Sequence, residues 1–424
     1  MSIAAGKTVL VIGTYDTKTD ELVFVEEIIN GLGAKVLALD VSILGETAHP
    51  VSITKHQVAE ASGRTITEII AFGEEALAMD AMAEGAVKIV RELVDNGRIH
   101  GVLALGGTMG TDLALDVYQE LPLGLPKYLI STVAFSAAVP PERLATDVQM
   151  ILWAGGLYGL NEICRATLAQ AAGAVVGAAV TARPVKLLRP IIGVTSLGNT
   201  CLKYIRSLKP ALEERGYDVA VFHSTGMGGR AFEALAEAGM FAAVLDLCLQ
   251  EFSNGLFGSI VASGADRLRG AGRAGIPQIV APGAVDLVDW PTWQELPAHW
   301  HDRPLHKHNK LISSLTLSGT ERKMVAREMA WRLKEAKGAV HVIMPLDGVE
   351  AWDREGEMGY APDDLASYYS ALKAELGDDV PYSEVSCHIN DGAFVDAVLA
   401  QFDRWCAEGV IEPPVAEAQR LAFG

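Results

Sequence analysis

A polar stretch near the start of the chain has the composition of a ligand-binding loop. Val9–Ile12 are apolar, and Gly13–Lys18 (GTYDTK) separates them from a helical pattern. A strand-end loop that leads into a helix offers free backbone N–H groups and a partial positive charge to an anion. Asp16 could hold a metal or cap the helix, and Lys18 could contact a phosphate. A simple N-cap is the alternative, and the Walker and GxGxxG spacings are both absent.

A second glycine-rich stretch strengthens the interpretation. In Leu103–Leu115 (LALGGTMGTDLAL), an apolar run ends at Gly106 and Gly107, and a helical pattern follows Thr111. A helix start needs only one cap, whereas this stretch has three glycines and two threonines. The excess predicts anion or nucleotide binding. Ser131 and Thr132 follow another apolar run and would lie at the same edge of a parallel sheet.

The second half of the chain carries its own polar loops. Phe222–Glu233 (FHSTGMGGRAFE) reads as a phosphate or carboxylate loop, with His223 available as an acid or base near neutral pH. Asp246 and Glu251 follow the next apolar run. The predicted catalytic candidates are His223, Asp246, Glu251 and His308, and the predicted substrate contacts are Thr195, Ser224, Thr225, Gly226, Gly228, Gly229 and Asn309.

Other polar loops leave alternatives open. His306 and His308 are two residues apart, which on a strand would suit a metal, but an exposed basic loop or a hydrogen-bonding His308 is favoured over zinc. Further polar side chains occur at Asp286, Asp289, Ser386, His388, Asn390 and Asp391. A Ser/His/Asp triad could be drawn from them, but the chain has no G-x-S-x-G elbow and we do not predict one.

The elements that position these loops repeat along the chain. Val9–Asp40 and Ile191–His223 each show a strand, a polar turn, a helix that ends at a glycine, and a second strand. Near-continuous apolar strands are typical of a parallel sheet covered by helices on both faces. Prolines and cations interrupt the pattern at Thr181–Pro190. The sequence therefore predicts two doubly wound α/β domains with mostly parallel sheets, 1–184 and 185–424.

Composition limits the class of partner and the compartment. The 424 residues include 35 basic and 53 acidic side chains, and the net charge of −18 argues against a nucleic-acid surface. Five cysteines without CxxC spacing predict buried thiols in a reducing compartment. The N-terminal apolar run is too short for a secretory signal, so a cytoplasmic protein is expected.

One apolar stretch is nearly long enough to span a membrane. Ala166–Ala182 is rich in alanine and glycine and is at the short limit for crossing a bilayer core of about 30 Å. Gly173 and Gly177 form a GxxxG spacing. We favour a helix packed closely against another helix, inside the protein or across a dimer interface, over a membrane span.

Taken together, the motifs resemble a known family. GTYDTK, GGTMGT, HSTGMGGRAFE, HKHN and HINDGAF occur in this order over nearly the whole chain. This set is similar to the uncharacterised protein family typified by the N-terminal region of the tomato mosaic virus resistance protein, the Tm-one-like ATP-binding family. The resemblance implies two Rossmann-like domains, ATP with Mg²⁺ in the first, and self-association as at least a dimer.

The resemblance also implies which residues contact the nucleotide. They are Gly13, Thr14, Tyr15, Asp16, Thr17, Lys18, Ala71, Phe72, Gly73, Gly106, Gly107, Thr108, Gly110, Thr111, Ser131 and Thr132, with Asp16 near Mg²⁺. The chain departs from the family's usual GGSGGT at Met109 and from its LDLTTTE at Cys248–Gln250. Because of these departures, the assignment of the nucleotide-binding loops is better supported than the assignment of any substrate.

Two classes of function agree with these patterns. The first is an enzyme that uses or is gated by ATP–Mg²⁺ and acts on a small carboxylate- or phosphate-bearing metabolite at the second domain or in a cleft between domains. The second is a non-catalytic nucleotide-binding module that regulates a protein partner. A plain dehydrogenase is disfavoured because the GxGxxG fingerprint is missing.

Overall fold

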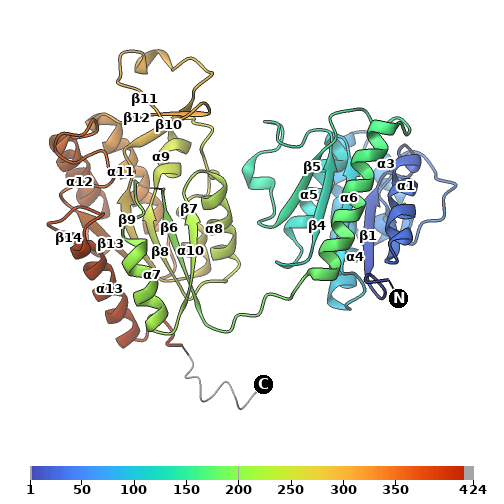
Figure 1. Cartoon of the computed structure of the whole chain (residues 1–424), viewed down its shortest axis with the longest axis horizontal. Helices are drawn as coiled ribbons and strands as arrows, with labels where there is room; N and C mark the ends of the chain where they lie inside the picture. The colour runs from blue at the N-terminus through green and yellow to red at the C-terminus, as the bar shows by residue number, and fades with distance from the viewer. Residues whose placement is uncertain (1, 199, 415–424) are drawn as a thin grey trace. The chain divides into compact units, whose positions relative to one another are not determined.

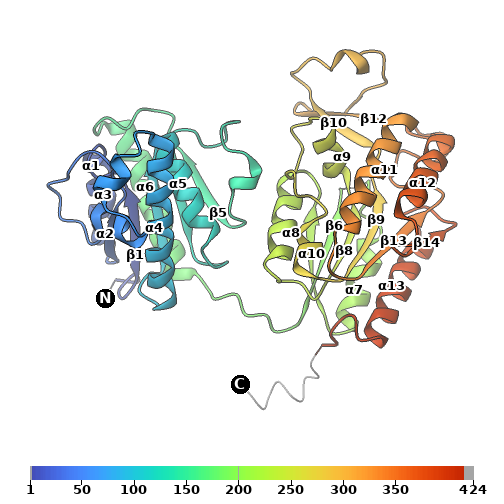
Figure 2. The same cartoon turned by 180° about the vertical axis from the view of Figure 1, so that it is seen from behind.

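The computed structural model describes residues 2–198 and 200–414, which form two compact α/β units divided between Lys186 and Leu187 (Figure 1). The sequence places this boundary two residues earlier, between 184 and 185. Each unit has a parallel sheet with helices on both faces, which Figure 2 shows from behind. The predicted fold class, two Rossmann-like domains with mostly parallel sheets, is confirmed.

The first unit, which we call domain one, contains a five-stranded sheet in the order β2-β1-β3-β4-β5. Its strands are β1 (Thr8–Gly13), β2 (Lys35–Asp40), β3 (Gly101–Gly106), β4 (Lys127–Ser131) and β5 (Val148–Leu152). One face is covered by α1 (Thr19–Gly31) and α6 (Glu162–Thr181). The other is covered by α2 (Lys55–Ala61), α3 (Ile66–Ile70), α4 (Glu75–Asp95) and α5 (Thr108–Gln119).

Domain two contains a six-stranded sheet in the order β14-β13-β9-β8-β6-β7. Its strands are β6 (Ile191–Ser196), β7 (Asp218–His223), β8 (Ala243–Cys248), β9 (Gln278–Gly283), β13 (Val340–Pro345) and β14 (Tyr382–Val385). A small antiparallel sheet is made of β10 (Leu287–Pro291), β12 (Ile312–Thr316) and β11 (His306–Lys307).

The helices of domain two also form two layers. One face of the sheet packs against α7 (Ile205–Glu214) and α13 (Gly392–Ala407). The other packs against α8 (Met227–Glu237), α9 (Gln250–Leu256), α10 (Gly270–Ala274), α11 (Gly319–Lys334) and α12 (Pro362–Leu376). Short 3₁₀ turns occur at Pro141–Arg143 and Ala298–Trp300.

Strand register brings the predicted loops to one edge of each sheet. In domain one, Gly13 at the end of β1 pairs with Asp40 at the end of β2, and Gly106 pairs with Ser131. In domain two, Ser196 at the end of β6 pairs with His223 at the end of β7. Because parallel strands end at the same edge, the loops that follow them converge there.

The apolar helix α6 packs through only one of its faces. Leu168, Ala172 and Val175 are fully buried against the sheet. A Cβ at Gly173 or Gly177 would meet no atom within 4 Å, so these glycines do not pack against another described element. The expected packing of this helix against another helix is confirmed, because α6 packs against α1, but the GxxxG glycines take no part in it. By length and composition alone α6 could cross a membrane, a test that core helices also pass.

Candidate functional site

A cavity of about 810 Å³ lies where the strand order of domain one reverses. The order β2-β1-β3 places the reversal between β1 and β3, and the cavity is lined by the loops that follow both strands. Open α/β sheets bind their ligands at this position. The volume is in the range of small-molecule and cofactor sites.

Nine of the sequence-predicted nucleotide residues line this cavity. They are Thr14, Asp16, Thr17, Lys18, Gly73, Gly106, Gly107, Thr108 and Gly110. The structure thus brings together two loops that are about ninety residues apart in the sequence. Seven other predicted residues are not among the lining residues: Gly13, Tyr15, Ala71, Phe72, Thr111, Ser131 and Thr132.

Several of these seven residues support the site from behind. Tyr15 is fully buried, and its hydroxyl donates to Glu26 Oε1 at 2.6 Å. The hydroxyl oxygens of Thr111 and Ser131 lie 2.7 Å apart and are also buried. These side chains fix the first turn of α5 and the end of β1 instead of facing the cavity.

The loop after β1 is held in place by the end of β2. Asp40 Oδ1 accepts hydrogen bonds from the backbone N–H of Tyr15 at 3.2 Å and of Ser42 at 2.9 Å. The N–H of Asp16 donates to Ser42 Oγ at 3.1 Å, and Asp16 Oδ2 accepts from the N–H of Gly45 at 2.9 Å. Asp16 therefore joins two walls of the cavity. Sequence reasoning missed Asp40 and Ser42, although an acid at the end of an apolar strand was the available signal.

Three helices that begin at the cavity, α1, α4 and α5, have no side-chain cap, and α4 begins with the acids Glu74 and Glu75. Neither α1, which starts after Lys18, nor α5, which starts after Gly107, has a capping side chain, whereas α2, α3 and α6 are capped. Their free N–H groups and partial positive charges favour an anion. Lys18 Nζ lies 5.9 Å from the centre of the Tyr158 ring and makes no ion pair within the described part of the chain.

Glycine is required where the strand meets the helix. A Cβ at Gly106 would lie 2.6 Å from the Cα of Gly110, so any side chain there would push α5 away from β3. A Cβ at Gly107 would meet only Thr132 Oγ1, at 3.8 Å. Gly106 thus serves packing, whereas Gly107 leaves its side-chain position open.

The remaining walls of the cavity are apolar with two acids. Ile43, Leu44, Ile70, Met79 and Met109 contribute apolar surface, and Glu74 and Glu75 lie at the start of α4. The sequence singled out Met109 as a departure from the family's usual loop, and it predicted the neighbouring Gly73. It did not indicate the other residues of this wall, because no motif marks a wall that is built from separate segments. The cavity combines the uncapped first turns of helices with an apolar surface.

A larger groove of about 860 Å³ lies between α4 and α5, but its chemistry is different. Its lining side chains pair with one another on the surface, as in Glu84–Lys88 at 2.8 Å and Arg91–Glu120 at 3.2 Å. It is lined by residues of α4 and α5 and by their C-terminal caps, with no strand-end loop. We therefore take the smaller cavity as the candidate site.

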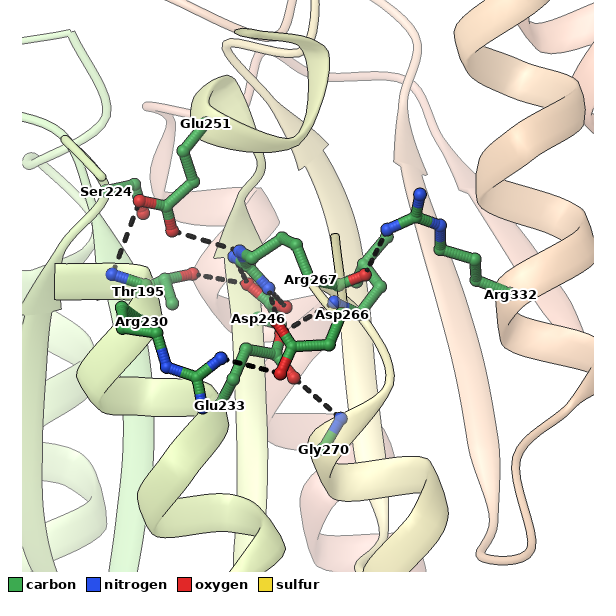
Figure 3. Close-up of polar contacts among 12 residues, drawn as sticks. Thr195, Ser224, Arg230, Glu233, Asp246, Glu251, Asp266, Arg267, Gly270 and Arg332 are labelled. Carbon is green, nitrogen blue, oxygen red and sulfur yellow. Dashed lines mark hydrogen bonds and ion pairs between the residues drawn. The ribbon is translucent and has the colours of Figure 1, made fainter. Parts of the chain in front are cut away.

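In domain two, the glycine loop predicted to bind an anion is already filled by a side chain of this protein (Figure 3). Glu251 Oε2 accepts hydrogen bonds from the N–H of Gly226 at 2.8 Å and of Gly229 at 3.3 Å. Glu251 is 1% exposed. The first turn of α8 is thus satisfied internally.

Glu251 belongs to a buried ion cluster that we call the Arg267 cluster: Arg267, Asp246, Glu233 and Glu251. Arg267 Nε donates to Glu251 Oε1 at 2.9 Å, its Nη1 to Glu233 Oε1 at 2.9 Å, and its Nη2 to Asp246 Oδ1 at 2.7 Å. Burial raises the pKa of Glu251 to about 7 despite the opposing effect of Arg267. Burial also raises the pKa of Glu233.

This cluster changes the interpretation of three predicted residues. Thr195 Oγ1 donates to Asp246 Oδ1 at 2.8 Å and accepts from the N–H of Cys248 at 3.0 Å. Thr195, Asp246 and Glu251 are all at most 2% exposed. They support the sheet edge from inside, a role that sequence reasoning did not foresee because the partner Arg267 is distant in the chain.

The other predicted residues of domain two are dispersed. His223 is exposed at the end of β7, and its Nδ1 accepts from the N–H of Gly198 at 3.4 Å. Ser224 is buried and donates to the carbonyl of Cys248 at 3.1 Å, whereas Thr225 is exposed. A Cβ at Gly228 would lie 1.8 Å from the carbonyl oxygen of His223, so this glycine closes the turn.

His308 and Asn309 lie beside the small antiparallel sheet. Asn309 Oδ1 accepts from the N–H of Leu311 at 2.7 Å and of Ile312 at 2.9 Å, which closes a turn. His308 is exposed. The ring of His306 lies 4.4 Å from that of Trp352. Among the described residues, no group of three or more His, Cys, Asp or Glu side chains could hold a metal.

A second group of buried acids follows β9 and β13. His388 Nε2 lies 2.9 Å from Asp353 Oδ1, and Asp286 pairs with Arg322 at 3.0 Å. Burial, and next the neighbouring Asp286, raise the pKa of Glu350 to about 9, so this carboxyl is protonated at neutral pH. The sequence pointed to Asp286 and His388 as polar loops but gave no signal for Glu350 or Asp353.

Fold and cavity together define a two-domain α/β protein with a ligand-sized cavity at the strand-order reversal of its first domain. Residues 7–184 match the N-terminal domain, and residues 189–406 the C-terminal domain, of the uncharacterised protein family UPF0261. The chain belongs to this family. The resemblance seen in the sequence motifs is thereby confirmed at the level of the family.

Relatives match along nearly the whole chain. A UPF0261 protein of Brucella melitensis is 52% identical over 403 residues, covering 95% of this chain and 96% of the relative. A UPF0261 protein of Clostridium tetani is 34% identical over 394 residues, covering 92% and 97%. The tomato protein "ToMV resistance protein Tm-1(GCR237)" is 28% identical over 427 residues, covering 93% of this chain and 55% of the relative.

Proposed function

We propose that domain one binds ATP together with Mg²⁺ in the cavity between the loops after β1 and β3, in a cytoplasmic protein. The observation that carries the proposal is the convergence of the uncapped N-termini of α1 and α5 and one unpaired lysine, Lys18, on a ligand-sized cavity. Two such N-termini suit a chain of phosphates better than a single carboxylate.

The cavity offers a separate place for each part of the nucleotide. The N–H groups at Gly107–Gly110 and the Lys18 ammonium would hold phosphates, since both favour anions. The apolar wall of Ile43, Ile70 and Met79 would accept the flat base.

The residues present also fit Mg²⁺. This ion is usually held by one or two carboxylates with substrate phosphates and water, and it needs no cage of protein ligands. Asp16 lines the cavity beside Lys18 and can supply a carboxylate. Bound there, the ion would neutralise phosphate charge, which the single lysine does only in part.

For the whole protein, we propose an enzyme that uses or is gated by ATP and acts on a small carboxylate- or phosphate-bearing metabolite. The exposed polar residues His223, Thr225 and His308 of domain two support this proposal. A non-catalytic regulatory module is the second candidate, and the Arg267 cluster favours it because two predicted catalytic acids, Asp246 and Glu251, are tied up internally.

Titration calorimetry of the full chain with ATP and Mg²⁺ tests the binding proposal. We expect saturable binding that Gly107→Val abolishes, while circular dichroism and melting temperature stay unchanged because the position is open. Absence of heat with ATP, ADP and GTP alike would refute nucleotide binding. Phosphate release by the wild-type protein would then distinguish the enzyme from the regulatory module.

We further propose that the open face of α6 mediates self-association, because Gly173 and Gly177 let a second helix approach closely. Gly177→Leu should reduce the sedimentation coefficient to that of a monomer without lowering the melting temperature. Gly31→Leu at the end of α1, where a side chain also meets open space, is the matched control. An unchanged oligomer in Gly177→Leu would exclude this face.

A further inference from the structure

The cavity of domain one has an acidic part directly beside its apolar wall. Glu74 and Glu75, which we call the Glu74–Glu75 pair, line the cavity together with Ala78 and Met79 of the same helix, α4. Residues three and four apart lie on one face of a helix, so the acids and the apolar residues belong to the same face of α4. The acids are one turn closer to the start of the helix than Met79 is.

The side chains of the Glu74–Glu75 pair are available to a ligand. Both are exposed, and Glu74 makes no capping hydrogen bond although it stands at the N-cap position. Neither acid forms an ion pair within the part of the chain that the structure describes. Two carboxylates repel phosphates, which we place at Lys18 and the first turn of α5. The pair therefore suits an uncharged part of the ligand that carries hydrogen-bond donors.

The usual place for an acid that binds a nucleotide's sugar is already occupied in this protein. In dinucleotide-binding α/β folds, an acid that follows the glycine-rich turn and its helix accepts a ribose hydroxyl. The acid at that place here is Asp40, at the end of β2, and it is 3% exposed. Its Oδ1 accepts from the N–H groups of Tyr15 and Ser42, and Asp40 does not line the cavity. A ribose in this cavity therefore needs another acceptor.

We propose that the Glu74–Glu75 pair accepts hydrogen bonds from the two ribose hydroxyls, so that the cavity selects ribonucleotides over nucleotides without these hydroxyls. The inference rests on the proposed binding of ATP and adds a determinant of specificity to it. The ribose of a nucleotide lies between the base and the phosphates. With the base on the wall at Met79 and the phosphates at Lys18, the sugar comes beside the start of α4. Hydrogen bonds to an ionised carboxylate are stronger than those between neutral groups.

Two nucleotides that differ only in the sugar test this inference on the wild-type protein. The full chain is titrated in a calorimeter with ATP and with 2′,3′-dideoxy-ATP, each with excess Mg²⁺. We expect ATP to bind about ten- to hundredfold more tightly, the loss that follows when hydrogen bonds to a charged group are removed. Equal affinities would overturn this inference and leave ATP binding intact. Absence of binding by both nucleotides would refute ATP binding itself, and this inference with it.

A double substitution assigns the selectivity to the pair. In Glu74→Ala/Glu75→Ala, the ratio of the two dissociation constants should fall to about threefold or less. Loss of two negative charges raises the affinity for both nucleotides alike, so the ratio reports the sugar contact alone. Both side chains are exposed, so the variant should fold. A wild-type ratio in this variant would show that the hydroxyls bind elsewhere and would overturn the proposal.

Asp20→Ala is the matched control for this double variant. Acids in the first turn of a helix also stabilise the helix itself, a role that the Glu74–Glu75 pair shares with Asp20 of α1. Asp20 is exposed as well, but it does not line the cavity. Asp20→Ala should therefore keep the wild-type ratio of the two dissociation constants. A ratio that fell equally in the control would assign the effect to the helices and not to the ribose, and would contradict the proposal.

Discussion

The two glycine loops of this protein look alike in sequence and differ in what fills them. Gly106–Gly110 in domain one lines a cavity, and the helix that follows has no side-chain cap. Ser224–Gly229 in domain two also leads into a helix, but Glu251 takes its N–H groups. The first loop borders an open cavity, whereas the N–H groups of the second are already bonded to Glu251.

The comparison shows that the residues of a glycine loop do not determine whether its backbone N–H groups are free to bind a ligand. Glycines and hydroxyls specify a turn whose backbone donors converge, and both loops have them. Whether a ligand can enter depends on a side chain from a neighbouring strand end, because a buried donor must find some acceptor. In domain two the acceptor is supplied by the chain, and we propose that in domain one it is supplied by ATP.

The largest expected effect is on the closed loop. Arg267→Met should lower the free energy of unfolding by about 3–5 kcal/mol, because it leaves three buried carboxyls without their cation. Urea denaturation measures this change. Arg273→Met is the control, since its half-exposed side chain pairs only at 3.5 Å. A loss below that of the control would mean that the cluster contributes no stability.

Removing the lysine tests the open loop. Lys18→Ala should weaken ATP binding by about 1.5–3 kcal/mol, or roughly ten- to hundredfold, through loss of a charge-assisted contact. The melting temperature should not change, because Lys18 makes no ion pair with the described residues. Calorimetric titration gives the affinity, and a wild-type dissociation constant would remove Lys18 from the site.

A matched pair of alanine substitutions compares the two loops directly. Gly229→Ala should cost about 1–3 kcal/mol of stability, since its Cβ would overlap Glu251. Gly107→Ala should change stability by less than about 0.5 kcal/mol, because nothing but Thr132 lies near its Cβ. Similar losses in both variants would show that the loops are equally filled.

A further expected effect is a slope of stability with pH. Since the pKa of Glu251 is raised from 4.5 to about 7, the folded state binds its proton more tightly than the unfolded chain does. Stability should therefore fall as pH rises through this interval, by at most about 1.4 kcal/mol per pH unit. Glu251→Gln should show a shallower slope between these pH values. A steeper slope in the variant would contradict the assignment.

Sequence patterns predict the strands and their loops because burial on both faces leaves long apolar runs that end in polar residues. Gly106–Gly110 and Asp16–Lys18 could be placed together for this reason alone. The sequence does not show that Thr111 bonds Ser131, or that Asp16 holds Gly45. Nor does it show that Glu251 enters the loop of Gly226. Such contacts depend on side-chain direction at strand ends, which no periodicity encodes.

Trp153, which follows β5, gives domain one a spectroscopic label of its own. It is the only tryptophan before residue 187, whereas six follow in domain two. Its backbone N–H donates to the carbonyl of Ser131, whose hydroxyl contacts Thr111 in the first turn of α5, and its indole N–H donates to the carbonyl of Gly156. A protein labelled with fluorotryptophan would therefore carry one fluorine nucleus close to the open loop. Its resonance should move when a nucleotide binds, while the six resonances from domain two stay in place.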